Sequence, residues 1–284
     1  MGGNETATPP LLSVIIPARN EAGYIGACLA ALCAQDLGAG PIEVIVAANG
    51  CSDDTAGAAR ACTEAFAARG WTLDVLDLPE GGKPGALNAA DTVARGPWRL
   101  YLDADIVCSP GLVAALRAAL DRPEPAYATG RLRLAPAASQ ITQHYGDFWT
   151  RLPFVRGGAV GAGLYAVNAP GRARWTTYPA IISDDSFVRL QFAPAERHEV
   201  PADYVWPLAE GFRALVRVRR RQDYGMRELF ALHPELARHE GKARLGPADL
   251  MQLAFAAPIG FLVYTAIALA VRARHAGGEF SRGR

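Results

Sequence analysis

The chain has 284 residues, of which 50% are hydrophobic, and carries 29 basic and 28 acidic side chains. The formal charge of +1 excludes a nucleic-acid-binding protein that works mainly by neutralising phosphates. The apolar content and near neutrality also exclude an intrinsically disordered chain, and the length suits one large domain or two ordinary ones.

Strand and helix patterns alternate through the first hundred residues. A short β-branched run at 12–16 predicts a strand, and further strands are expected at 42–47, 73–78 and 98–102. Helical patterns lie between them at 24–33, 55–69 and 85–94. This alternation predicts a parallel sheet with helices on both faces. Ligands of such sheets bind beyond the carboxyl ends of the strands, which is where the polar clusters of this sequence lie.

Beyond about residue 125 the alternation loosens. A strand is expected at 127–134, followed by Gly-rich loops around 157–163 and an Arg-rich stretch at 213–221. We find no internal repeat and no low-complexity linker between the two halves, so we expect them to form one domain.

Residues 250–271 form a nearly continuous apolar run. About 20 apolar residues can cross a bilayer core, and Pro258 and Gly260 in the middle of the run are tolerated better in a membrane helix than in a soluble one. Basic residues flank the run on both sides, which does not favour a simple crossing. The run predicts membrane contact, as a transmembrane helix or as an interfacial segment kinked at Pro258, with a soluble core helix as the alternative.

Asp103, Ala104 and Asp105 close the strand at 98–102. Because side chains two apart in an extended chain point to the same side, the two carboxylates can share one divalent cation or divide it with a nucleotide ribose. Such oxygen ligands suit Mg²⁺ or Mn²⁺, whose remaining positions are filled by diphosphate and water. The alternative is a solvated acidic turn or a helix cap.

Lys83 follows two glycines and precedes a predicted helix, so it can meet a phosphate. The alternative for Lys83 is an ordinary surface lysine. Asp184 and Asp185 are adjacent carboxylates that repel one another, so one of them can serve as a base. Their alternative is a helix N-terminus with favourable dipole charges.

The Arg-rich stretch contains four arginines between residues 217 and 221. These side chains can bind a diphosphate bidentately. The alternatives are a solvated basic helix face and a strip attracted to anionic lipid near the apolar run.

Five motifs in this order resemble those of family 2 glycosyltransferases. They are PARNE at 17–21, NGCSDDT at 49–55, Gly82-Lys83 with Asn88, DAD at 103–105 and Asp184-Asp185, and RRRQ at 219–222 extends the match. The resemblance covers about residues 12 to 225. It implies a GT-A fold (an α/β fold with a mixed, mostly parallel sheet flanked by helices), a nucleotide-diphospho-sugar donor, a divalent cation (Mn²⁺ or Mg²⁺) and inversion at the anomeric carbon.

The resemblance also assigns roles on the donor side. Pro17, Arg19, Asn20 and Glu21 would hold the base and the ribose. Asn49 and Asp53 would line the uracil pocket. Ala48 stands where the family often has Asp, so one base contact is missing.

Further roles concern the diphosphate and the chemistry. Asp103 would contact the ribose or a metal-bound water, Asp105 would ligate the metal, and Lys83, Ala104 and Asp184 would also contact the nucleotide sugar. Asp185 matches the aspartate that takes the acceptor proton. Arg219 and Arg221 match a segment that binds the diphosphate in many members of the family. Gln222 stands where a tryptophan associated with processive synthesis would be. Its absence predicts transfer of a single sugar.

The expected protein is therefore an inverting glycosyltransferase that moves one sugar, expected from a UDP-sugar, to an acceptor hydroxyl. The apolar run and the arginines favour a lipid-linked or membrane-associated acceptor in bacterial glycolipid, cell-envelope or exopolysaccharide synthesis. We expect attachment to the cytoplasmic face of the inner membrane through residues 250–271. We expect a flexible N-terminus at 1–10, a catalytic domain at 11–228 and a C-terminal region at 229–284. Within the catalytic domain, residues 11–125 would bind the nucleotide and residues 126–228 would bind the acceptor.

Three other classes compete with this prediction. A nucleotidyltransferase would usually carry a Gly-rich phosphate loop after the first strand, where this chain has ARNE at 18–21. A non-catalytic membrane scaffold would not need the acidic motifs together with Lys83. A retaining transferase on the same fold is distinguished only by the configuration of its product.

Overall fold

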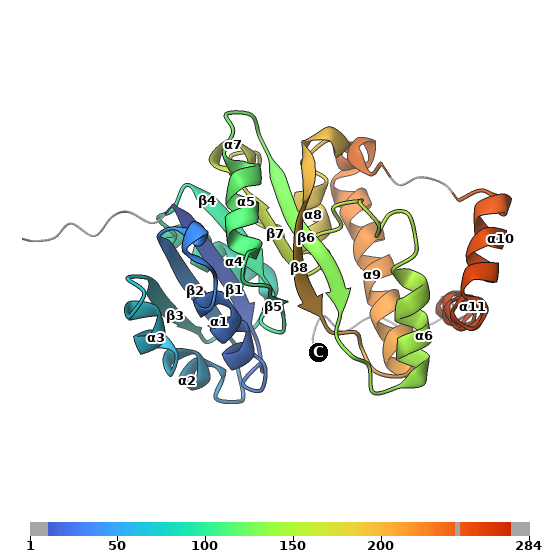
Figure 1. The fold of residues 1–284 in the computed structure, drawn as a ribbon, viewed down its shortest axis with the longest axis horizontal. Helices are drawn as coiled ribbons and strands as arrows, with labels where there is room; N and C mark the ends of the chain where they lie inside the picture. Colours follow the sequence, from blue (N-terminus) through green and yellow to red (C-terminus); the bar gives the residue numbers. More distant parts are fainter. Residues whose placement is uncertain (1–10, 242–244, 274–284) are drawn as a thin grey trace, which may run out of the picture.

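The computed structural model describes residues 11–241 and 245–273. Within them, eight strands form one sheet in the order β3-β2-β1-β4-β7-β6-β8-β5 (Figure 1). The strands are β1 (Leu12–Ala18), β2 (Ile42–Asn49), β3 (Thr72–Leu78), β4 (Trp98–Leu102), β5 (Val107–Cys108), β6 (Tyr127–Leu134), β7 (Leu164–Val167) and β8 (Arg197–Trp206).

Helices occupy most of the remaining described chain. They are α1 (Ile25–Cys33), α2 (Thr55–Arg60), α3 (Thr63–Ala67), α4 (Lys83–Val93), α5 (Leu112–Leu120), α6 (Gln140–Trp149), α7 (Ala169–Arg172), α8 (Asp184–Arg189), α9 (Phe212–Leu232), α10 (Pro247–Ala256) and α11 (Pro258–Arg272), with 3-10 turns at Leu37–Ala39, Pro194–Glu196 and Pro234–His239.

The sheet is mixed and mostly parallel, as the sequence predicted. Strands β3, β2, β1 and β4 run parallel, whereas β7 is antiparallel to both β4 and β6 and β5 is antiparallel to β8. Since β7 opposes β4 and β6, these two strands point the same way. Their carboxyl ends therefore lie at the same edge of the sheet as those of β1 and β2.

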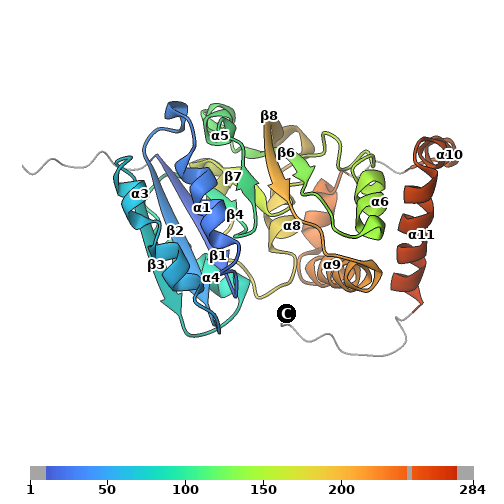
Figure 2. The same cartoon turned by 60° about the horizontal axis from the view of Figure 1, so that its bottom comes forward.

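Helices cover both faces of the sheet (Figure 2). The buried side chains of α1, α2, α3 and α5 pack on one face, and those of α4 and α8, with Leu229 of α9, pack on the other. All seven residues of β1 are buried, with Val14 facing the first layer and Ile15 the second. This two-sided burial explains why the strands have continuous apolar runs rather than alternating ones.

Two helix predictions differ from the structure. The helix expected over 55–69 is broken into α2 and α3, and the second piece turns so that Phe66 is fully buried against the sheet. The helix expected from residue 85 begins at Lys83 instead. Pro84 is accommodated because the first turn of a helix needs no intrahelical N–H.

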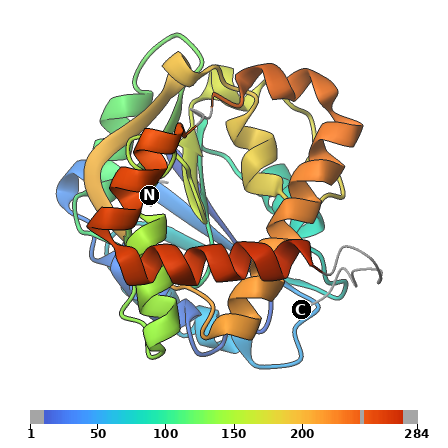
Figure 3. The same ribbon diagram turned by 90° about the vertical axis from the view of Figure 1, so that its right-hand side faces the viewer.

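The apolar run at 250–271 folds into two helices rather than one. Ala257 has a non-helical backbone (φ −150°, ψ 69°), and Pro258 starts α11 (Figure 3). Across residues 11–241 and 245–273, no helix combines the length and the apolar composition needed to span a bilayer.

The two C-terminal helices form one end of the molecule (Figure 1). Helix α11 packs across α6 and α9, whereas α10 has no buried residue. The predicted domain boundary at 228 falls inside α9, and the predicted flexible N-terminus at 1–10 lies outside the described residues.

Candidate active site

Lys83 connects two acidic motifs that are far apart in the sequence. It is the first residue of α4, and its Nζ lies 2.8 Å from Asp103 Oδ1 and 3.0 Å from Asp184 Oδ2. The three side chains line one small hollow with Pro17 and Gly163, at the carboxyl edge of β1 and β4. Three of the predicted motifs therefore meet where ligands of α/β sheets bind.

Burial and neighbouring charges shift the pKa values of Lys83 and Asp184. Burial alone would lower the pKa of Lys83, but Asp103, Asp184 and Asp185 outweigh it and hold that pKa above its usual value. Burial raises the pKa of Asp184 to about 6, with Lys83 opposing the shift and Asp185 and Asp103 adding to it. Lys83 is therefore a fixed positive charge, and Asp184 is a carboxylate whose charge depends on that lysine.

The DAD motif lies in a turn and not, as expected, in the extended chain of a strand. Strand β4 ends at Leu102, and the N–H of Ile106 donates to the carbonyl of Asp103 (3.2 Å), so the alternation of an extended chain does not apply. The backbone N–H of Asp103 donates to Gly163 O (2.8 Å), and Ala104 is buried. The turn, rather than strand pleating, positions Asp103 and Asp105.

The carboxylates of this turn fit a divalent ion that is shared with a substrate. Among the described residues, no group of three His, Cys, Asp or Glu side chains could hold a metal alone. Asp103 and Asp105 supply two, and Mg²⁺ or Mn²⁺ commonly takes one or two carboxylates together with substrate phosphates and water. The donor set is thus suited to an ion that binds with a diphosphate.

Asp184 and Asp185 open α8 but face different surroundings. Asp184 is buried and paired with Lys83, whereas Asp185 is half-buried and its Oδ1 accepts a hydrogen bond from Ser186 N (2.6 Å). Asp184 is therefore held in an ion pair inside the protein, whereas the carboxylate of Asp185 is partly exposed.

Asn49 is a connector between three elements. Its Nδ2 donates to Ala18 O (2.9 Å) and Ala47 O (3.1 Å), and its Oδ1 accepts from Gly82 N (3.0 Å). The buried amide therefore joins the ends of β1 and β2 to the residue before Lys83. Its predicted contact with a nucleotide base stays a prediction.

The remaining donor-side residues build the loops around these strand ends. Asp53 accepts from Ala22 N (3.1 Å) and from the hydroxyl of Thr55. The Thr55 hydroxyl also accepts from the N–H of Glu21, which is buried, at 2.8 Å. Hydrogen bonds thus tie the PARNE segment to the 49–55 segment. The nucleotide pocket expected between these segments stays a prediction.

Asn20 and Arg19 lie at the exposed end of the same loops. Asn20 has a left-handed backbone (φ 56°), and its Oδ1 accepts from Ser52 N (2.8 Å). The guanidinium of Arg19 lies against Gly81, where a Cβ would come within 2.9 Å of Arg19 Cζ. Both side chains are exposed to solvent.

Arg219 and Arg221 differ in their surroundings. Arg219 donates to the hydroxyl of Tyr145 (2.9 Å) and stacks over the ring of Tyr264, 5.2 Å from its centroid. These contacts tie α9 to α6 and α11, on the side of the C-terminal helices. Arg221 is exposed, and the diphosphate role predicted for both arginines stays a prediction.

Sequence reasoning missed one clamp next to the cluster. Asn88, which the motif pattern singled out without a role, bonds the backbone of Tyr178 twice. Gly163, which pairs with Asp103, was noted only as part of a Gly-rich loop. Neither Tyr178 nor Gly163 carries a local pattern that points to the site, because both act through backbone atoms from distant segments.

The family model for glycosyl transferase family 2 matches residues 13–173. The chain belongs to this family. It is also similar to the glycosyltransferase AglE of Haloferax volcanii, with 36% identity over 106 residues, which cover 37% of this chain and 33% of that protein. The match thus spans about one third of the length of this curated relative.

Several solved structures share the GT-A fold of this family 2 member. A mannosyltransferase from Pyrobaculum calidifontis in complex with GDP-Man and Mn²⁺ has a TM-score of 0.57 and 22% identity, covering 97% of this chain and 79% of its own. Glucosyl-3-phosphoglycerate synthase from Mycobacterium tuberculosis, with Mn²⁺, UDP and phosphoglyceric acid, has a TM-score of 0.55 and 18% identity, covering 80% and 79%. Staphylococcus aureus TarS 1-349 with UDP-GlcNAc has a TM-score of 0.51 and 14% identity, covering 92% and 91%. At these low sequence identities, the structural similarity shows that the proteins share a fold and nothing more specific.

Proposed function

We propose that this chain transfers one sugar from a nucleoside-diphosphate sugar to an acceptor hydroxyl, with inversion at the anomeric carbon. The observation that carries the proposal is the ammonium group of Lys83 between Asp103 and Asp184 at the carboxyl edge of the sheet. A fixed positive charge beside the metal-type DAD turn suits a diphosphate leaving group.

On the donor side, we assign a separate role to each group of residues. Lys83 would bind the diphosphate, Asp103 and Asp105 would hold the divalent ion, and the 17–21 and 49–55 loops would enclose the nucleoside. A bound divalent ion would supply further stabilisation of the negative charge on the leaving diphosphate. Similar folds contain GDP-Man in one case and UDP or UDP-GlcNAc in others, so both bases belong in the donor test.

The acceptor side depends on Asp185. Its half-buried carboxylate at the start of α8 can take the proton of an acceptor hydroxyl as that oxygen attacks the anomeric carbon. Asp184 beside it is paired with Lys83, so its role is to hold the lysine rather than to move a proton.

Donor specificity is testable by thermal stabilisation. A nucleotide that binds only the folded protein raises the melting temperature by mass action. We expect a rise with UDP or GDP and their sugars that depends on Mn²⁺, and a smaller rise for Asp105→Asn. Glu64→Gln, an exposed change on α3, is the matched control. Absence of any nucleotide effect would refute the donor site.

The catalytic assignment is testable with Asp185→Asn. Loss of a general base typically lowers turnover by about 10²–10⁴-fold, while donor binding by thermal shift should remain. The anomeric configuration of the product, read by NMR coupling constants, tests inversion. Turnover of Asp185→Asn at the wild-type rate would contradict the assignment.

The proposed acceptor is membrane-associated, with the chain attached peripherally to an anionic bilayer surface. Helices α10 and α11 expose Phe255 (82%), Leu262 (67%) and Met251 (60%), an unusual concentration of large apolar side chains at one end of the molecule. Helix α9, which packs against α11, exposes Arg213, Arg217 and Arg221. An apolar surface beside basic side chains suits an interface with anionic lipid.

Sedimentation with vesicles tests this attachment. We expect binding to phosphatidylglycerol-containing vesicles and weaker binding to pure phosphatidylcholine. The double variant Phe255→Ser/Leu262→Ser should lose most of the binding and keep its melting temperature, because both side chains are exposed. Equal sedimentation of wild type and variant would refute a bilayer contact through these helices.

A further inference from the structure

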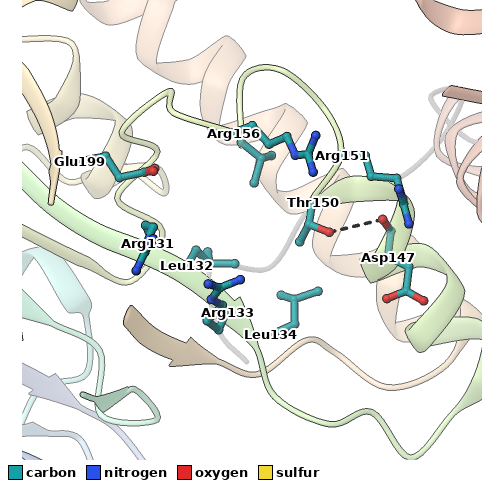
Figure 4. A pocket seen from close by; sticks show the side chains of 10 residues that line it. Arg131, Leu132, Arg133, Leu134, Asp147, Thr150, Arg151, Arg156 and Glu199 are labelled. Atoms are coloured by element: carbon teal, nitrogen blue, oxygen red, sulfur yellow. Dashed lines mark hydrogen bonds between the residues drawn. The ribbon is translucent and has the colours of Figure 1, made fainter. Parts of the chain in front are cut away.

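We propose that a hollow beside the end of β6 binds a phosphate group of the acceptor. The hollow has a volume of about 480 Å³ and lies between β6 and the end of α6 (Figure 4). Its charged lining consists of Arg131, Arg133, Arg151, Arg156, Asp147 and Glu199. None of the site residues predicted from the sequence lies in this lining.

The charges around the hollow favour an anion. Arg131 Nε and Arg133 Nε both donate to the single carboxylate of Asp203, at 3.0 and 3.1 Å, so one acid serves two guanidinium groups. Within residues 11–241 and 245–273, no carboxylate lies within salt-bridge distance of Arg151 or Arg156. Even with Asp147 and Glu199 counted, positive charge remains in excess.

Guanidinium groups from two different elements suit a phosphate in particular. Arg131 and Arg133 are two apart on β6, so they project from the same side of the strand, and Arg151 and Arg156 come from the segment after α6 (Figure 4). The planar fork of arginine binds phosphate oxygens bidentately. The hollow thus offers forked donors from β6 and from the segment after α6.

The hollow is joined to the candidate active site by one short loop. Arg156 lines the hollow, and Gly163, seven residues later, accepts the backbone hydrogen bond of Asp103. The loop between them has left-handed residues at Gly157, Ala159 and Gly161. The wall of the hollow that carries Arg156 is therefore continuous, through this loop, with the segment that contacts Asp103.

The hollow also borders the apolar C-terminal end. Val155 lines the hollow and belongs to a cluster with Phe148 and Leu152, against which Leu253 of α10 and Phe261 of α11 pack. The phosphate can therefore belong to a soluble metabolite or to a lipid headgroup. The shared chemistry is a phosphate ester next to an acceptor hydroxyl.

The acceptor role of the hollow rests on the proposed function, whereas anion binding by it does not. The test is an NMR titration of arginine Nε–Hε signals with glycerol 1-phosphate, in the presence of UDP and Mn²⁺ and again without them. We expect shifts of the signals of Arg131, Arg133, Arg151 and Arg156 under both conditions. The double variant Arg151→Gln/Arg156→Gln should weaken binding about tenfold or more, and the matched double variant Arg227→Gln/Arg238→Gln should not.

Two results would overturn the inference. The first is a titration of the wild-type protein in which none of these four arginine signals shifts. The second is an equal affinity for glycerol 1-phosphate in the wild type and in Arg151→Gln/Arg156→Gln. Failure of UDP binding with a normal phosphate response would instead count against the proposed function alone.

Vesicles distinguish the two sources of the phosphate. Vesicles that contain phosphatidic acid should bind more weakly to Arg151→Gln/Arg156→Gln if the source is a lipid headgroup. A response to glycerol 1-phosphate with no difference between the proteins on vesicles assigns the site to soluble phosphate esters.

Discussion

Asn88 and Tyr178 exchange two hydrogen bonds across 90 residues of sequence. Asn88 Nδ2 donates to Tyr178 O at 3.0 Å, and Tyr178 N donates to Asn88 Oδ1 at 2.7 Å. The side-chain amide thus acts as a strand-like partner for the backbone that leads into α8. It fixes the helix of Lys83 relative to the segment that carries Asp184 and Asp185.

Asn88→Ala should therefore disturb both stability and catalysis. Loss of two hydrogen bonds to buried backbone groups is expected to cost about 1–3 kcal/mol in the free energy of unfolding. We expect kcat to fall more than donor affinity, because the change moves the acid pair rather than the nucleoside loops. Denaturant unfolding and steady-state kinetics measure the two effects, with Thr92→Ala on the exposed side of α4 as the control. Unchanged kcat would show that the clamp does not position Asp185.

Lys83→Gln tests the charge between the acid motifs. The change leaves Asp103 and Asp184 without their shared cation and removes a donor to the diphosphate. We expect kcat/KM for the sugar donor to fall by about 100-fold or more, with partial recovery in Lys83→Arg. Wild-type kinetics in Lys83→Gln would contradict the proposed donor site.

Glu43 links stability to pH. It is buried, and its carboxylate accepts from Ser13 Oγ (2.6 Å), Arg95 Nε (2.7 Å) and Gly96 N (3.0 Å). Burial alone would raise the pKa of Glu43, but these hydrogen bonds outweigh it and hold the pKa below its usual value. The stabilisation is therefore present above the unfolded-state pKa of about 4.3 and is lost as the pH falls through the lower folded-state value.

Glu43→Gln should accordingly destabilise the protein by about 1–3 kcal/mol at pH 7 and by less at pH 3. Urea unfolding at several pH values measures the difference between wild type and variant. Glu64→Gln is a control without buried partners. A difference that does not shrink on acidification would show that the charge of Glu43 is not what stabilises the fold.

At Gly260 the backbone of α11 lies close against α6. A Cβ at this position would lie 2.8 Å from His144 O and 2.9 Å from Phe148 Cβ, both on α6. Gly260→Val should therefore separate the helices and lower the free energy of unfolding by about 1–3 kcal/mol.

Gly26 of α1 provides the matched control for that change. Nothing lies within 4 Å of a Cβ placed there, so Gly26→Ala should stabilise the protein by about 0.5–1 kcal/mol through helix propensity alone. Thermal and urea unfolding of both variants make the comparison. Stabilisation by both changes would mean that α11 does not pack on α6 through Gly260.

The strands were predictable because their signals are local. Short strand-like runs gave the expected positions of β1, β2, β3, β4 and β6, and the strand–helix alternation predicted the parallel part of the sheet. The break inside the Ala-rich 55–69 run was less visible, because it depends on which side chains find a partner in the core. The break in the 250–271 run instead falls at Pro258, the residue at which the sequence indicated a kink.

The sequence by itself determined the family, the order of its motifs and the edge of the sheet at which they gather, because parallel strands deliver their carboxyl ends to one side. Only the tertiary structure decided which residues of these motifs contact one another. It placed Lys83 between Asp103 and Asp184, turned Arg219 toward Tyr145 and Tyr264, and used Asn49 as a connector. It also gathered arginines from β6 and the 150–156 segment around one hollow. Contacts of this kind join residues far apart in the chain, and no local pattern of side chains encodes them.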